Sequence, residues 1–251
     1  MRFLIGRSDR PAKHARPGGL ELTRRLLAAA RIEGADVVEL GPGLGRTADD
    51  IVALHPRSYV GVDDTAAATE TVRRIVAPVQ GSVVVADAAE TGLPRASVDV
   101  VVGEAMLTMQ GEKAKRAIVA EAFRVLRPGG RYAIHELGLK PDSMPQDTKD
   151  EIRRDMARAI KVNARPLTVA EWGQLLTETG FEIATVDHAP MALLNPARVL
   201  ADEGPAGVVR ILGNLIKSGA ARRRVLGMRR TFYRYRSSLT AVAVVGIVPG
   251  T

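Results

Sequence analysis

Residues 37–47 read Val37-Val38-Glu39-Leu40-Gly41-Pro42-Gly43-Leu44-Gly45-Arg46-Thr47, and this segment carries the clearest indication of the fold. An apolar run with one acidic residue predicts a buried strand, and the alternating glycines predict a tight turn into a helix. Glycine permits turn conformations barred to other residues and lets a ligand approach closely. The helix start offers unpaired N–H groups to an anionic ligand group. A dinucleotide-binding turn would have glycine in place of Arg46, so the loop is not typical of pyrophosphate binding.

A second predicted strand, residues 58–63, also ends in an acidic residue. Asp63 follows Gly41 by 22 positions, close to the roughly 20 that separate a ribose-binding carboxylate from its glycine turn. An ionised carboxylate has two acceptor oxygens for the two ribose hydroxyls. The alternative for Asp63 is a helix N-cap before residues 66–76, a role that Asp64 or Thr65 can fill instead.

Further strands and helices alternate along the chain. Residues 82–88 predict a buried strand with Asp87 at its end, and residues 97–106 predict another that carries Glu104. A helix around residues 121–127 is stopped by Pro-Gly-Gly and passes into a strand. This alternation from residue 36 to residue 137 argues for a parallel sheet with right-handed crossovers.

The acidic residue and glycines of residues 39–45, together with the Leu-x-Pro-Gly-Gly segment at 126–130, resemble the class I S-adenosylmethionine-dependent methyltransferases, in particular the ubiquinone/menaquinone-methyltransferase-like type 11 proteins. The resemblance covers residues 18–188 well and the final strand reasonably. It implies a doubly wound α/β domain with a seven-stranded mixed sheet, an antiparallel last strand and S-adenosylmethionine as cofactor. The cofactor-binding residues implied are Glu39, Gly41, Pro42, Gly43, Gly45, Asp63, Asp64, Asp87, Ala88 and Glu104.

Transfer of a sulfonium methyl is expected to need in-line displacement, without a metal or a covalent intermediate. The first candidate for a general base is His135, with Glu136 beside it as an orienting group. Strand alternation allows that pair to share a face only if the strand ends there. Glu104 is the second candidate, and for it and His135 the alternative is a structural hydrogen-bond partner. The residues expected to contact the acceptor are His14, Met106 and Arg222.

Between the predicted strands 181–188 and 239–248 lie about 50 residues, too long for a structureless loop. We therefore predict a methyltransferase domain over residues 1–194 and 237–251, with a basic helical insertion or lid over 195–236. This insertion holds ten Lys or Arg against Asp202 and Glu203, so its net charge of +8 equals that of the whole chain. Residues 207–216 predict one helix and residues 220–236 a second. The alternatives are a solvated surface, contact with an anionic substrate group or membrane, and, ranked lowest, nucleic acid.

Composition sets further bounds. The 251 residues suffice for one large domain with an elaboration, and the absence of cysteine excludes disulfides, thiolate metal sites and cysteine nucleophiles. The longest apolar run, residues 241–248, is far below the roughly 20 residues that span a bilayer. Residues 1–6 hold too short an apolar stretch for a signal peptide. The chain is expected to be soluble and cytoplasmic.

The expected function is methyl transfer from S-adenosylmethionine to oxygen, nitrogen or carbon of a small-molecule acceptor. One alternative is a membrane-associated methyltransferase that acts on a lipid or quinone. The other is a non-catalytic module that binds S-adenosylmethionine. The identity of the acceptor and the oligomeric state are left open.

Overall fold

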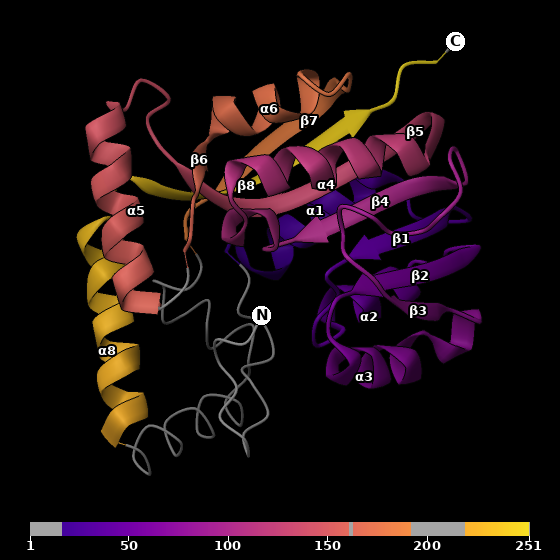
Figure 1. Ribbon diagram of the computed structural model, residues 1–251, viewed down its shortest axis with the longest axis horizontal. Coiled ribbons are helices and arrows are strands. Elements are labelled where there is room, and N and C mark those ends of the chain that lie inside the picture. Colours follow the sequence, from indigo (N-terminus) through magenta and orange to yellow (C-terminus); the bar gives the residue numbers. More distant parts are fainter. Residues whose placement is uncertain (1–16, 161–162, 192–218, 251) are drawn as a thin grey trace.

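The computed structural model describes residues 17–160, 163–191 and 219–250 (Figure 1). Its strands are β1 (Asp36–Leu40), β2 (Ser58–Asp63), β3 (Ser82–Val85), β4 (Val98–Glu104), β5 (Leu126–Leu139), β6 (Leu167–Thr168), β7 (Glu182–Ala189) and β8 (Leu239–Ile247). Its helices are α1 (Gly19–Ala30), α2 (Arg46–Val52), α3 (Ala66–Val76), α4 (Glu112–Val125), α5 (Gln146–Ile160), α6 (Val169–Thr177) and α8 (Gly219–Arg234), with 3-10 turns η1 (Ala77–Val79) and η2 (Leu107–Met109).

The strands form one sheet in the order β3-β2-β1-β4-β5-β8-β7, and β6 pairs with β5 outside this path. β1 to β5 run parallel, whereas β8 is antiparallel to both β5 and β7. The predicted doubly wound α/β sheet with an antiparallel last strand is therefore confirmed, with the two-residue β6 as an addition. The strand order reverses between β1 and β4, and ligands of such sheets bind at the carboxyl ends beside this point.

Strand alternation divides the core into two layers. Val37 packs in a cluster with Leu22 and Leu26 of α1, whereas its neighbour Val38 packs on the other face with Ile118 of α4. Successive side chains of a strand point to opposite faces, so the apolar run of β1 is buried on both sides. Helices α1 to α3 thus cover one face of the sheet, and α4 and α6 cover the other.

Helices α5 and α8 lie side by side at one end of the molecule (Figure 1). Phe232 of α8 is buried with Ile152 of α5 and with Leu139, at the carboxyl end of β5. α8 is the helix predicted over residues 220–236, whereas the one predicted over 207–216 lies outside the described residues. Within the described ranges, none of the helices has the length and apolar character needed to cross a bilayer.

The strand predicted over residues 82–88 forms as β3, but it is shorter than predicted, and of its four residues only Val83 is buried. β3 ends at Val85, and the side chains of Val84 and Val85 are 37% and 53% exposed. β3 lies at the edge of the sheet and pairs with β2 alone among the described strands, so one side of it faces solvent. A run of valines does not distinguish an edge strand from a central one. Asp87 consequently lies in the turn that follows the strand.

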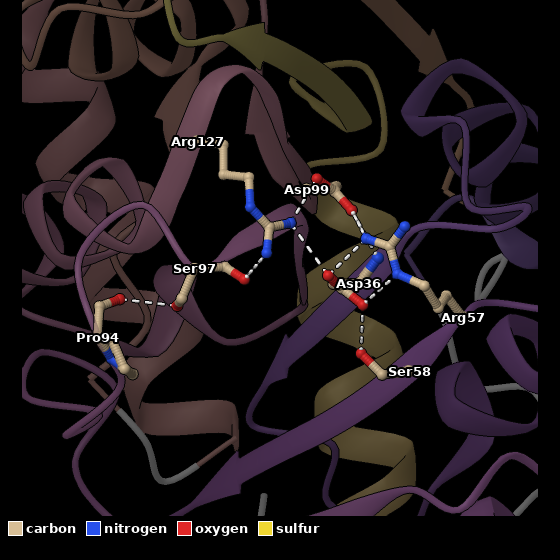
Figure 2. A network of polar contacts seen from close by, with 7 residues as sticks. All are labelled: Asp36, Arg57, Ser58, Pro94, Ser97, Asp99 and Arg127. Atoms are coloured by element: carbon tan, nitrogen blue, oxygen red, sulfur yellow. Dashed lines mark hydrogen bonds and ion pairs between the residues drawn. The ribbon is translucent and has the colours of Figure 1, made fainter.

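The amino ends of the strands are joined by a network of two aspartates and two arginines (Figure 2). Nη2 of Arg57 lies 2.5 Å from Asp36 and 2.8 Å from Asp99, and Nη1 of Arg127 lies 3.0 Å and 2.6 Å from the same carboxylates. The hydrogen bond from Arg57 holds the pKa of Asp36 well below its usual range. Because these residues stand at the starts of β1, β4 and β5 and just before β2, the network ties four strands together.

Candidate functional site

The glycine turn follows β1 at the carboxyl edge of the sheet. Gly41 and Gly45 both have positive φ, +66° and +76°, a conformation that favours glycine. A Cβ added to Gly45 would lie 2.4 Å from Cδ1 of Ile75, so the end of the Ile75 side chain would have to move to admit it. The N–H of Gly41 donates to the carbonyl of Val62 at 2.8 Å, which fastens the turn to the end of β2.

Asp63 links the glycine turn to the start of α3. Its Oδ2 accepts the N–H of Gly43 at 3.1 Å, and its Oδ1 accepts the N–H of Thr65 at 2.9 Å. Thr65 is the N-cap of α3, and its own side chain makes no capping hydrogen bond. Asp63 is 8% exposed, and each carboxylate oxygen has a second lone pair that a ligand hydroxyl can use.

Three other predicted acidic residues differ in burial. Glu39 is buried in β1 and accepts the hydroxyl of Tyr59 at 2.6 Å. Burial, followed by the charge of Glu39, raises the pKa of Tyr59 well above its usual value. Asp64 and Asp87 are exposed, and Oδ1 of Asp87 accepts the N–H of Ala89 at 2.7 Å. The turn after β3 therefore presents a carboxylate to solvent beside Ala88.

His135 of β5 lies opposite Glu104, the last residue of β4. Nδ1 of His135 lies 2.8 Å from Oε1 of Glu104, and Nε2 accepts the N–H of Gly18 at 3.1 Å. The hydroxyl of Thr23 donates to the same Glu104 oxygen at 2.8 Å, and the hydroxyl of Thr47 donates to the other. These partners fit a neutral imidazole with its proton on Nδ1, and they join α1 and α2 to the sheet edge.

The predicted pairing of His135 with Glu136 does not form. β5 continues to Leu139, so these neighbouring side chains point to opposite faces of the sheet. The partner of His135 is Glu104 instead. Glu136 is fully buried, and it accepts hydrogen bonds from the turn that follows β4.

That turn brings Met106 to the glycine loop. A Cβ built on Gly41 would lie 3.5 Å from Cβ of Met106, and one built on Gly103 would lie 3.6 Å from its Cγ. Of the predicted acceptor residues, Met106 therefore lies beside the glycine turn. His14 and the side chain of Arg222 lie outside the described residues.

Glu39, Asp63 and Glu104 thus come from three adjacent strands and surround one glycine turn. Such a set suits a ligand with ribose hydroxyls and positive charge. Sequence reasoning missed the groups that hold these carboxylates, in particular Tyr59, Thr23, Thr47 and Gly18. Only the position of Thr23 on the apolar face of α1 offered a signal, because a buried hydroxyl needs a partner.

Comparison with known proteins agrees with this geometry. Residues 37–130 match the family model described as a methyltransferase domain. An uncharacterized protein of Haemophilus influenzae is 32% identical over 234 residues, 91% of each chain. A probable S-adenosylmethionine-dependent methyltransferase of Mycolicibacterium smegmatis is 34% identical over 158 residues, which are 62% of this chain and 55% of that one.

A solved structure shows how far the fold extends. The crystal structure of MccD protein superposes with a TM-score of 0.73 at 16% identity and covers 93% of this chain and 99% of that one. At this identity the likeness concerns the fold alone, and the sequence matches supply the family. The chain belongs to the class I S-adenosylmethionine-dependent methyltransferases, and it is an enzyme with S-adenosylmethionine as its cofactor.

Proposed function

We propose that this enzyme transfers the methyl group to oxygen, nitrogen or carbon of a small-molecule acceptor by in-line displacement at the carboxyl ends of β1, β2 and β4. The observation that carries this proposal is the hydrogen bond between Asp63 and the N–H of Gly43. This bond makes the proposed ribose-binding carboxylate and the glycine turn one structural unit. A dinucleotide-binding turn would have glycine in place of Arg46.

The residues at this edge suit the cofactor in charge and in hydrogen-bonding capacity. In this proposal Asp63 accepts the ribose hydroxyls through its remaining lone pairs, and Asp64 lies next to it. Asp87 and Ala88 face the adenine from the turn after β3. The glycine turn, Gly41 to Gly45, lets the cofactor approach the backbone, and Glu39 supports the turn from β1. Glu104 supplies negative charge towards the cationic end of the cofactor.

The cofactor supplies a sulfonium methyl that is already activated for displacement. The protein then has to hold nucleophile, methyl and sulfur in line and keep water out, which can supply roughly 7 to 11 kcal/mol of barrier reduction. Both ring nitrogens of His135 are bonded to protein groups. We therefore assign to His135 and Glu104 the role of holding α1 against the site, and propose that positioning dominates over general-base help.

For the acceptor we propose an anionic group bound near α8. Arg229, Arg230 and Arg234 of this helix are exposed, as is Arg236 just beyond it. The apolar residues Met228 and Phe232 are used in packing against α5 and are not available to enter a bilayer. A lipid or quinone acceptor at an anionic membrane surface is the second candidate, since these arginines would adsorb there electrostatically. The cytoplasmic location stays a prediction.

Formation of S-adenosylhomocysteine by the purified protein tests the proposal. Acidic, phenolic and lipid acceptors are screened with the wild type and with Asp63→Ala. We expect product with at least one acceptor class from the wild type, and a clear loss in the variant at subsaturating cofactor. Failure of the wild type to bind S-adenosylhomocysteine would contradict the proposed site, and equal rates for the two proteins would remove Asp63 from it.

A further inference from the structure

A buried carboxylate holds the turn between β4 and α4. Oε1 of Glu136 accepts the N–H groups of Met106 at 3.0 Å and Leu107 at 2.7 Å. Oε2 accepts the N–H of Thr108 at 3.0 Å and its hydroxyl at 2.6 Å. One side chain in the middle of β5 thus satisfies three successive backbone donors 28 to 30 residues earlier in the chain.

Burial of the Glu136 carboxylate would be unfavourable without these hydrogen bonds. Glu136 is fully buried, and burial raises its pKa. All four of these hydrogen-bond partners are donors, so the ionised carboxylate matches the turn, and an amide NH₂ group in its place would face a donor. Leaving these buried donors unsatisfied would destabilise the turn. The carboxylate is therefore specific for this turn geometry.

The turn is also held from its other side. The carbonyl of Thr108 accepts the N–H of Arg165 at 2.7 Å, and the carbonyl of Arg165 accepts Nζ of Lys115 at 2.8 Å. Lys115 is fully buried and lies over the ring of Trp172. Between these two anchors the turn has little freedom to move.

The far end of this turn meets the glycine loop. Ala105 has a φ of +54°, a conformation that is strained for a residue with a Cβ. Its N–H donates to the carbonyl of His135 at 2.8 Å. The next residue, Met106, packs against Gly103 of β4 and against Gly41 of the glycine loop. Met106 thus connects the turn bonded to Glu136 with the glycine loop.

We propose that Glu136 is a positioning residue for cofactor binding: it fixes the turn Met106–Thr108 and so holds Met106 against Gly41. This inference rests on the proposed cofactor site, because Met106 packs against the glycine turn from the side of β4. Glu136 itself touches neither the cofactor nor the acceptor and acts through Met106.

A double-mutant cycle of Glu136→Gln and Met106→Ala, read by calorimetric titration with S-adenosylhomocysteine, tests this. Each single variant is expected to raise the dissociation constant by at least about fivefold, as expected for loss of one buried interaction. The dissociation constant of the double variant should be no more than about twofold above that of whichever single variant binds more weakly. The effects of coupled residues are not additive. Fully additive losses, or unchanged affinity of Glu136→Gln, would overturn the proposal.

Thr108→Val and Thr108→Ser provide a milder matched pair should Glu136→Gln not fold. The valine is close in shape and removes only the hydroxyl donor, whereas serine keeps it. Hydrogen exchange at Met106, Leu107 and Thr108 should accelerate in Thr108→Val and stay unchanged in Thr108→Ser, with affinity following the same order. Equal exchange and affinity in the two variants would contradict the proposal.

Asp99→Asn is the control at the opposite end of β4, where the carboxylate accepts the N–H of Asp36 at 2.9 Å. It should lower the melting temperature while leaving affinity for S-adenosylhomocysteine intact. If affinity falls equally in Asp99→Asn and Glu136→Gln, the effect is general destabilisation and the positioning role is lost. If the wild type itself does not bind S-adenosylhomocysteine, the proposed function fails first.

Discussion

The two ends of the sheet use acidic residues in opposite ways. At the amino end, Asp36 and Asp99 each contact two arginines (Figure 2). At the carboxyl end, Asp63 is bonded to backbone N–H groups, and Glu136 is bonded to backbone N–H groups and one hydroxyl. Neutral donors fix the position of a carboxylate without supplying a positive charge.

This difference shows how one fold separates stability from binding. An aspartate matched by an arginine has its charge balanced by the protein, and its contribution is to join strands. A carboxylate held by backbone donors keeps a negative field that a cationic ligand can use. The amino end therefore serves the fold, and we infer that the carboxyl end serves the cofactor.

The largest effect on cofactor affinity is expected from removing the Asp63 carboxylate at the carboxyl end of the sheet. Asp63→Ala should raise the dissociation constant for S-adenosylhomocysteine at least about tenfold, because the proposed ribose contacts and the bond that shapes the glycine turn are both lost. Titration calorimetry measures this. Asp36→Ala is the matched control at the other end and should leave affinity within about twofold. Similar losses in both variants would show that the two ends of the sheet do not differ in their role.

A smaller effect, on membrane binding, is expected at α8, which packs near the carboxyl end of β5. Arg230→Gln should weaken sedimentation with anionic phosphatidylserine vesicles about fivefold, since each Arg near such a surface contributes about 1 kcal/mol. Added salt should weaken the wild type as well. Arg24→Gln, on an exposed position of α1, is the control. If the wild type does not sediment with the vesicles, the lipid acceptor is excluded and the soluble anionic acceptor remains.

The smallest effect concerns acid stability at the amino end. Because its folded pKa is lowered, Asp36 stabilises the protein above its unfolded pKa of about 3.9, and this contribution is lost as pH falls below that value. Asp36→Asn should therefore be less stable than wild type by about 1 kcal/mol at neutral pH, given the exposure of Arg57. Urea unfolding at neutral pH and near pH 3 should show this gap shrinking. A gap that stays constant would contradict the assignment.

The parts of the site that sequence could predict are those fixed by local chain geometry. Gly41, Gly43 and Gly45 have positive φ directly after a strand, and the spacing to Asp63 follows from one strand-helix-strand unit. The parallel sheet with its antiparallel last strand followed from the order of elements and the family resemblance. These features depend on neighbours in sequence or on the fold as a whole.

The partners across the fold could not be predicted in the same way. Whether His135 meets Glu104 or Glu136 depends on the β4–β5 register and on how far β5 continues. The bond from Gly18 to His135 spans 117 residues, and no local pattern marks it. For Glu136, the one signal was a carboxylate inside an apolar strand, which must find donors. The sequence did not indicate that a turn some 30 residues earlier supplies them.

Hydrogen exchange of the wild-type protein with and without S-adenosylhomocysteine shows whether the carboxyl end of the sheet binds the cofactor. We expect slower exchange on ligand binding at residues 41–45, at Thr65 and at residues 104–108, with no change at the amino-end network around Asp36 and Arg57. Protection confined to the amino end, or an unchanged glycine turn in a protein that binds the ligand, would contradict this expectation.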